Sequence, residues 1–267
     1  MREFGTLGKH KAVLGMVHLA PLPGTPFHEE GSLSRIIDTA VGSACALAEG
    51  GADGCLVQTV DRVYSPGEDS DPARTAAMAV IVDAIAQATG EGFQIGVQLM
   101  RNALKSSLAV AKVAGGSYIR AGALVGATLT AHGMVEARPL EVMEYRAKIS
   151  AQHVKIIAEV ESMHFRWFGE DRPVAEVARA AVDTGADAVA LCHRDEDRVL
   201  QMITSVRQAV PETPVILAGY TSHQNAARLL AAADGAFVGT CLERGGWGGQ
   251  IDPVRVRAYM DIVRGLE

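Results

Sequence analysis

A carboxylate and a histidine are the residues of this 267-residue chain best suited to move protons. Glu159 lies in the apolar run KIIAEV, and His18 lies in VLGMVHL. A carboxyl group that is partly removed from water has a raised pKa, which suits a general acid or base, and imidazole suits the same roles. Structural roles are the alternative. Glu159 could pair with an arginine, and His18 could anchor the proline-rich segment that follows it.

Arginines and amides lie at the ends of other apolar runs. Arg101 and Asn102 end IGVQLMRN, Arg120 ends SYIR, and Gln58 lies in CLVQT. Guanidinium groups bind carboxylates and phosphates through a planar fork of N–H donors. We therefore expect these side chains to bind a small polar substrate. The alternative for the arginines is the neutralisation of buried carboxylates such as Glu159.

Two further histidines are candidate substrate-binding residues, namely His164 in ESMHF and His193 in LCHR. With Glu159 they could form a metal site, but neither HxH nor HExxH spacing supports one. We expect no metal ion and no other cofactor. Cys192 precedes His193, and adjacent strand residues face opposite sides, so an inert buried thiol is the expected state of this cysteine.

Glycines near the end of the chain are candidates for binding phosphate. Gly219 follows the run PVIL, and Gly239 and Thr240 follow GAFV. Such loops offer backbone N–H groups to an anion. Tyr220 and Glu243 weaken the pattern, because the first replaces a possible second glycine and the second adds negative charge.

Eight short apolar runs must position these residues. They are 13–19, 55–59, 95–102, 117–120, 155–160, 188–194, 214–220 and 235–240. The intervening stretches carry Ala, Leu, Val and Ile at helical spacing. Continuous apolar runs that alternate with helices are typical of a parallel sheet, and eight such units predict a single (β/α)8 TIM barrel over residues 1–267. Active sites of such barrels lie at the carboxyl ends of the strands, where the candidates above should meet.

Composition excludes several classes of function. The formal net charge is −6, so no basic surface predicts a nucleic-acid partner. No apolar stretch reaches the length of a membrane span, and the N-terminal segment lacks the hydrophobic region of a signal peptide. We expect a cytoplasmic protein. The cysteines, which show no CxxC pair, should be free thiols, and apolar outer helices such as 74–88 allow a homo-oligomer.

Several connecting segments carry their own signals. GGADGCLV, TGADAVAL and AAADGAFV repeat one motif before three of the runs, and we assign their acidic turns to stability. Asp71 and Pro72 are a plausible cap and first residue of a helix. The loops 20–32 and 121–139 are longer than a connection needs, so we expect them to cover the mouth of the barrel.

Five segments of the chain resemble the BtpA/SgcQ family. They are GMVHLAPLPGTP, LMRNALKSSLAVAKVAGGSYIR, TLTAHGMVEARPLEVMEYRAKI, LLAAADGAFVGTCLERGG and IDPVRV. The resemblance spans essentially the whole chain and implies a (β/α)8 barrel. It also implies links to photosystem I biogenesis, to nucleosidases and to bacterial sugar uptake. The family's motif positions correspond to His18, Pro21, Pro23, Arg101, Asn102, Arg120 and Glu136.

The chain departs from the family pattern at several strand ends. Gln58 and Thr59 stand where the family has Glu-Asn, and Ala103 stands where it has Asp. Gly122 lies near a usual Asn, the segment 218–220 replaces Gly-Ser-Gly, and Glu243 replaces Lys. The resemblance therefore implies a divergent member with a different ligand, or one without catalysis.

These observations predict an enzyme that acts on a small sugar-like or nucleoside-like substrate, which could be phosphorylated. Hydrolysis of a glycosidic bond is the favoured reaction, with Glu159 as the acid and with Gln58 and Asn102 orienting hydroxyl groups. A sugar-phosphate isomerase or lyase is the next reaction, although a Schiff-base mechanism is disfavoured because Lys155 begins its strand. A non-catalytic assembly factor is the alternative outside enzymology.

Overall fold

Eight parallel strands form a closed barrel in the computed structural model, which describes residues 4–5 and 7–266. Around the barrel, the strand order is β1-β10-β9-β8-β7-β4-β3-β2. The strands are β1 (Ala12–Leu19), β2 (Gly54–Thr59), β3 (Gln94–Gln98), β4 (Tyr118–Ala121), β7 (Lys155–Glu161), β8 (Ala188–Leu191), β9 (Val215–Leu217) and β10 (Gly235–Val238). Each coincides with one of the apolar runs, so the predicted (β/α)8 barrel is confirmed.

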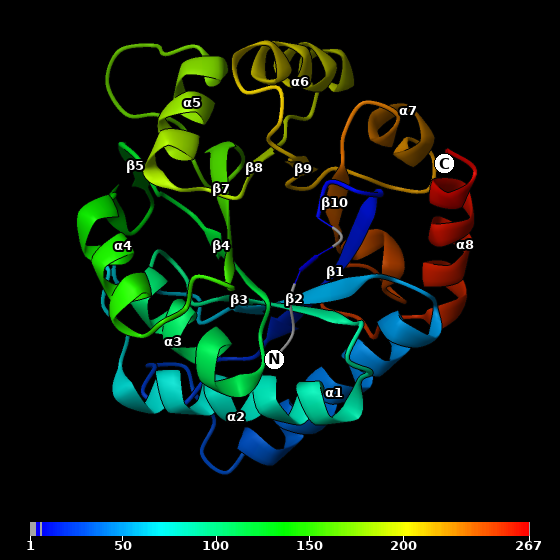
Figure 1. Cartoon of the computed structure of the whole chain (residues 1–267). Coiled ribbons are helices and arrows are strands. Elements are labelled where there is room, and N and C mark those ends of the chain that lie inside the picture. The colour runs from blue at the N-terminus through cyan, green and yellow to red at the C-terminus, as the bar shows by residue number, and fades with distance from the viewer. Residues whose placement is uncertain (1–3, 6, 267) are drawn as a thin grey trace.

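Helices surround the strands, as Figure 1 shows. They are α1 (Leu33–Glu49), α2 (Pro72–Ala88), α3 (Leu104–Ala114), α4 (Pro139–Lys148), α5 (Val174–Thr184), α6 (Glu196–Ala209), α7 (Ala226–Leu230) and α8 (Pro253–Arg264), with a short 3-10 helix η1 (Thr240–Leu242). The start of α2 is as expected, because the Asp71 side chain accepts a hydrogen bond from the Ala73 N–H at 2.8 Å. In the described part of the chain, no helix has the length and hydropathy needed to cross a membrane.

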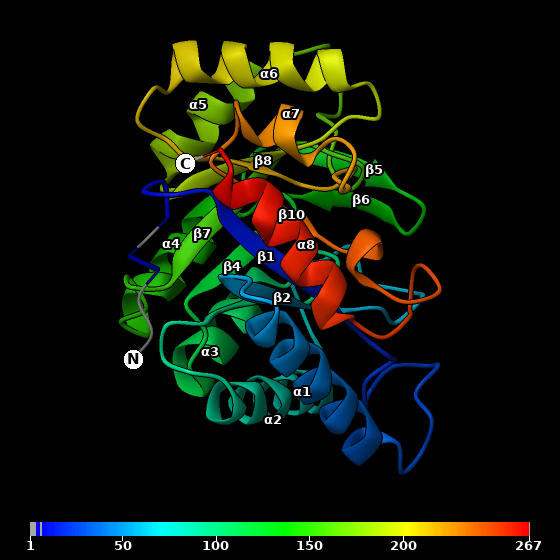
Figure 2. The same cartoon turned by 90° about the vertical axis from the view of Figure 1, so that its right-hand side faces the viewer.

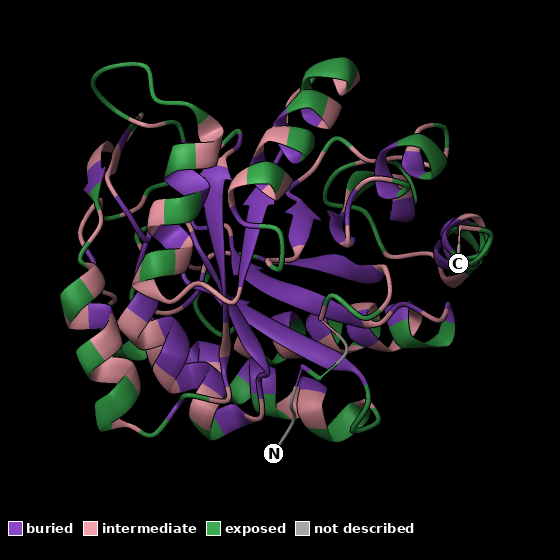
Figure 3. Cartoon of the chain, turned by 45° about the horizontal axis from the view of Figure 1, so that its top comes forward, coloured by how far each residue is buried: buried purple, intermediate pink, exposed green. Residues whose placement is uncertain are grey.

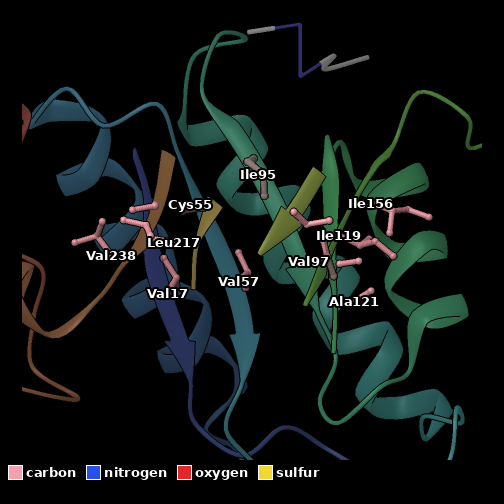
Figure 4. Packing of buried hydrophobic residues seen from close by; sticks show 14 of the residues in the cluster. Val17, Cys55, Val57, Ile95, Val97, Ile119, Ala121, Ile156, Leu217 and Val238 are labelled. Carbon is pink, nitrogen blue, oxygen red and sulfur yellow. The ribbon is translucent and has the colours of Figure 1, made fainter. Parts of the chain in front are cut away.

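The core has two layers. Side chains that point outward from the strands pack against the helices, among them Val17, Val57 and Ile119 (Figure 4). Burial is densest in the strands, and the exposed residues lie on the outer surfaces of the helices and in the connecting loops (Figure 3). The inner layer fills the barrel and includes Tyr118. Gly96 makes room for this ring, since a β-carbon at Gly96 would lie 2.1 Å from Tyr118 Cε2.

The acidic turns link neighbouring strands at the amino-terminal end of the barrel. In each case the Oδ2 atom of the aspartate accepts the N–H of a residue in the preceding strand. Asp53 accepts from Val13 at 2.8 Å, and Asp187 accepts from Ile156 at 2.9 Å. Asp234 accepts from Val215 at 2.8 Å. This arrangement gives the repeated motif the structural role that we expected from its sequence.

The segment between β4 and α4 contains an antiparallel hairpin, formed by β5 (Ala127–Thr130) and β6 (Gly133–Glu136). From its sequence, this segment was expected to be only a long loop. The hairpin projects from the same end of the molecule as the loop before α1 and the segment after β10 (Figure 2). It is held by the loop after β7, because the N–H of Arg166 donates to Thr128 Oγ1 at 3.1 Å.

Candidate functional site

A cavity of about 450 Å³ opens at the carboxyl ends of the strands. Most of the residues predicted from the sequence line it. The lining side chains among them are His18, Gln58, Arg101, Arg120 and His164. The predicted phosphate-binding residues Gly219, Gly239 and Thr240 also line it. The structure therefore brings together, at one mouth, residues that are far apart in the sequence.

Strand alternation explains why these side chains turn inward. Residues two apart on a strand share a face. Leu14 and Met16 belong to the inner layer of the core, so His18 shares their face on β1. By the same rule Arg120 follows the inner Tyr118 on β4. The inner layer of the barrel thus ends in polar groups at the cavity.

Arg120 is a buried cation at the base of the cavity. It is 2% exposed, and its Nε lies 2.9 Å from Oε1 of the fully buried Glu159. Its guanidinium carbon lies 4.9 Å from the centre of the Phe237 ring. Within the described residues, Nη2 of Arg120 has no hydrogen-bond partner. An unpartnered, buried donor on a cavity-lining cation is suited to bind an anion or a polarised oxygen.

Glu159 does not line the cavity. Its Oε1 faces Arg120, and its Oε2 accepts a hydrogen bond from the Ser162 hydroxyl group. Ser162 in turn accepts hydrogen bonds from the N–H groups of His164 and Phe165, both at 3.0 Å. This geometry corresponds to the structural alternative of the sequence analysis, a carboxylate paired with an arginine.

His18 lines the cavity with a depressed pKa. Burial is the main cause, the charge of Arg120 acts in the same direction, and a hydrogen bond with Gln58 opposes both. Its ring lies 5.8 Å from the ring of Trp247. His18 Nδ1 also lies 3.9 Å from Oε1 of the buried Glu243. The imidazole is therefore neutral at neutral pH and available to accept a proton.

Arg101 and His164 form a second polar pair. Arg101 Nη1 lies 3.3 Å from His164 Nδ1, and the Arg101 guanidinium stacks over the Tyr64 ring at 5.1 Å. The pKa of His164 is lowered to about 4; burial is the main cause, Glu159 opposes it, and the charges of Arg120 and Arg101 act in the same direction as burial. The cavity thus combines two cationic side chains with two neutral imidazoles.

Two predicted binding residues lie outside this cavity. Asn102 is buried, and its side chain forms two hydrogen bonds with the backbone of Ala123. Its Nδ2 donates to the Ala123 carbonyl oxygen at 2.9 Å, and its Oδ1 accepts from the Ala123 N–H at 2.8 Å. Its hydrogen-bonding groups are thereby used to brace the loop after β4. His193 lines a neighbouring cavity after β8. Their positions at strand ends did not indicate that these two side chains point away from the main cavity.

The aromatic rim of the cavity, which was not predicted from the sequence, consists of Tyr64, Tyr220 and Trp247. Trp247 is 65% exposed and lies in the glycine-rich segment GGWGG, a composition that could have marked it as a mouth residue. Tyr220 has a positive φ of 59°, which the sequence did not reveal. Among the described residues, no group of three His, Cys, Asp or Glu side chains could hold a metal ion.

Comparison with protein families identifies relatives along almost the whole chain. The sequence model of the BtpA family matches residues 9–265. The photosystem I biogenesis protein BtpA of Synechocystis sp. is 32% identical over 98% of this chain and 91% of its own length. An uncharacterized protein of Archaeoglobus fulgidus is 30% identical over 96% of this chain and 99% of its own length.

Solved structures with a similar fold are distant in sequence. Tryptophan synthase from Mycobacterium tuberculosis has a TM-score of 0.59 and 20% identity, with 97% of this chain and 93% of that chain covered. The native KDPGal structure has a TM-score of 0.57 and 16% identity, with 94% of this chain and 95% of that chain covered. At such identities the similarity establishes the barrel fold and does not extend to chemistry.

Proposed function

This chain belongs to the BtpA family, and from that premise we propose that its barrel is an enzyme acting on a small, phosphorylated, sugar-like or nucleoside-like molecule. The observation that carries the proposal is Arg120, a buried cation that lines the cavity with an unpartnered N–H donor beside the neutral His18. A buried, preorganised donor next to a base is suited to proton transfer at a polarised oxygen.

The charge of the cavity favours reactions that develop negative charge. Cleavage of a glycosidic bond passes through an oxocarbenium-like state, which is positive and is destabilised by the Arg101 guanidinium, while the charge of Arg120 is already compensated by Glu159. Removal of a proton next to a carbonyl group produces an enediolate, which Arg120 and Arg101 would stabilise. The geometry therefore supports a sugar-phosphate isomerase or lyase over the glycosidic hydrolysis that the sequence favoured.

In this proposal each polar group has a defined role. His18 accepts the proton from the carbon next to the carbonyl, and Arg120 binds the carbonyl oxygen. Glu159 keeps Arg120 in place, and Gln58 orients a hydroxyl group of the substrate. The substrate phosphate lies against the loops that carry Gly219, Gly239 and Thr240.

Proton exchange in deuterated water tests this function. We expect proton NMR to show deuterium incorporation next to the carbonyl of one member of a panel of sugar phosphates. His18→Gln should slow this exchange on the order of 100-fold or more. His10→Gln, at the opposite end of the barrel beside Asp53, is the matched control and should leave it unchanged. Release of a free base from a nucleoside, without any exchange, would contradict the proposal in favour of hydrolysis.

A non-catalytic role in assembly is the second candidate, because a relative with 32% identity is named as a biogenesis protein. Exposed apolar side chains near the mouth, including Phe27 and Trp247, could contact a protein partner. In a genetic complementation assay this role predicts that Phe27→Ser with Trp247→Ser abolishes function and that Arg120→Lys preserves it. The enzyme proposal predicts that Arg120→Lys abolishes function.

A further inference from the structure

A second cavity of about 380 Å³ lies beside the first, at the carboxyl ends of β7 and β8. Met163 and Tyr220 line both cavities, so these two side chains form the partition between them. The polar side chains of this side cavity include Arg166, His193 and Arg194. A ligand in the main cavity could extend past the partition and reach these groups.

The side cavity is rich in free hydrogen-bond donors. His193 Nδ1 accepts the N–H of Asp195 at 3.0 Å, which leaves Nε2 as the donor of this ring. Arg194 Nε donates to the Tyr220 hydroxyl group at 3.3 Å, which leaves its terminal N–H groups available. The Arg166 guanidinium forms no ion pair or side-chain hydrogen bond with any described residue.

The carboxylate of the side cavity is already neutralised. Glu161 Oε1 lies 3.6 Å from Nη2 of Arg198, a residue that lines neither cavity. The remaining charges, on Arg166 and Arg194, are both positive. Since guanidinium and imidazole donors recognise phosphate and carboxylate oxygens, this cavity suits an anion.

The backbone of Tyr220, one of the two partition residues, is held in a specific conformation. Gly219 has a φ of +143°, and the following Tyr220 has a φ of +59°, a left-handed conformation that is uncommon for residues other than glycine. The Tyr220 carbonyl accepts a hydrogen bond from Asn225 Nδ2 at 3.0 Å. Strained backbone of this kind is concentrated at functional sites.

We propose that the side cavity binds a second anionic group of the same substrate, so that the substrate carries two anionic ends. This inference rests on the proposed function for the end held in the main cavity. It narrows the substrate class from sugar phosphates in general to bisphosphates or to sugar phosphates with a carboxylate.

Titration with inorganic phosphate tests the side cavity alone. We expect the NMR signals of the His193 imidazole to shift saturably as phosphate is added, in the wild type and in Arg120→Lys. The shift should disappear in the double variant Arg166→Gln with Arg194→Gln. Arg172→Gln, which removes an exposed arginine that stacks on Trp167, is the matched control and should retain it. No saturable shift, or a shift that persists in the double variant, would overturn the inference.

Calorimetry with two sugar probes tests the connection between the cavities. The wild type should bind ribulose 1,5-bisphosphate about tenfold more tightly than ribose 5-phosphate, a difference of about 1.4 kcal/mol. The double variant should bind the two probes equally. If ribose 5-phosphate binds and Arg120→Lys abolishes that binding while the bisphosphate has no advantage, the proposed function stands and this inference fails. If His193 responds to phosphate while Arg120→Lys changes no affinity, the side cavity stands and the proposed function fails.

Discussion

At the scale of single residues, the pair of Arg120 and Glu159 determines what the cavity can do. Both side chains are buried, so removing one charge leaves the other without compensation. We expect Glu159→Gln to lower the free energy of unfolding by about 3–5 kcal/mol in urea denaturation. A double replacement, Arg120→Met with Glu159→Leu, should recover much of this loss and abolish ligand binding. A stable Glu159→Gln variant that has lost all turnover would instead identify Glu159 as a catalytic acid.

His164 makes stability depend on pH. Its pKa is about 4 in the folded protein and 6.5 in the unfolded chain, so the unfolded chain binds the proton first as pH falls. The folded state is therefore destabilised progressively from pH 6.5 down through pH 4, by up to about 3 kcal/mol. His164→Gln lacks this group. Between pH 7 and pH 4.5, the free energy of unfolding measured in urea should fall less in His164→Gln than in the wild type. An equal fall in both proteins would contradict the assignment of this pH dependence to His164.

Protonation of His18 should set the acidic limb of the pH–rate profile. Because its pKa is lowered in the folded protein, the base form persists below pH 6.5. We expect the rate of proton exchange, measured against pH, to fall only below that value. A profile that declines already above pH 6.5 would place a different group in the role of base.

Strand position could predict the inward face of a side chain but not whether it reaches the cavity, because Glu159 follows the inner-layer Ile157 by two positions and does not line the cavity. His18 and Arg120 follow inner-layer residues by two positions and do line the cavity. Strand position could not predict that Asn102 bonds to the backbone of Ala123, since that contact depends on the loop after β4. Trp247 lies after the last strand, where no periodicity indicates its direction.

At the scale of elements, the aspartate turns stabilise the end of the barrel away from the cavity. Asp187 accepts hydrogen bonds from the N–H of Ile156 at 2.9 Å and from Lys155 Nζ at 2.9 Å, and it pairs with Arg146 at 3.0 Å. We expect Asp187→Ala to lower the free energy of unfolding by about 2 kcal/mol while ligand affinity is unchanged. Asp183→Ala, on the exposed surface of α5, should change neither quantity.

Contacts of Glu68 hold the loop between β2 and α2 at the mouth of the cavity. Its Oε1 accepts the N–H of Lys105 at 2.6 Å, its Oε2 lies 3.1 Å from Lys105 Nζ, and the loop carries Tyr64 of the rim. Glu68→Ala should speed hydrogen exchange in residues 60–71 and weaken ligand binding several-fold. Glu141→Ala removes the other partner of Lys105 and is the control. Unchanged exchange in Glu68→Ala would show that other contacts hold the loop.

The barrel strands were predictable and the hairpin was not. The strands are buried on both faces and read as continuous apolar runs. The hairpin strands β5 and β6 have four residues each and mixed exposure. Part of their support comes from distant segments, such as the N–H of Arg166, so local sequence carries a weak signal for them.

At the scale of the whole molecule, the two ends of the barrel have different tasks. The amino-terminal end carries the aspartate turns, and the carboxyl-terminal end carries the cavity, the hairpin and the aromatic rim. The formal net charge is −6, yet the cavity is lined by two arginines and two neutral histidines. An overall acidic protein with a locally cationic cavity is suited to bind a small anion selectively and to avoid polyanions.

The most direct measurement is thermal denaturation of the wild type and of Arg120→Lys in the presence of sugar phosphates. Lysine preserves the charge opposite Glu159 and removes the forked donors. A ligand at a hundredfold its Kd adds about 2.7 kcal/mol, which should raise the Tm of the wild type by about 5 °C. We expect one class of sugar phosphate to produce this rise in the wild type and none in Arg120→Lys. An equal rise in both proteins, or no rise with any sugar phosphate, would contradict a binding site built around Arg120.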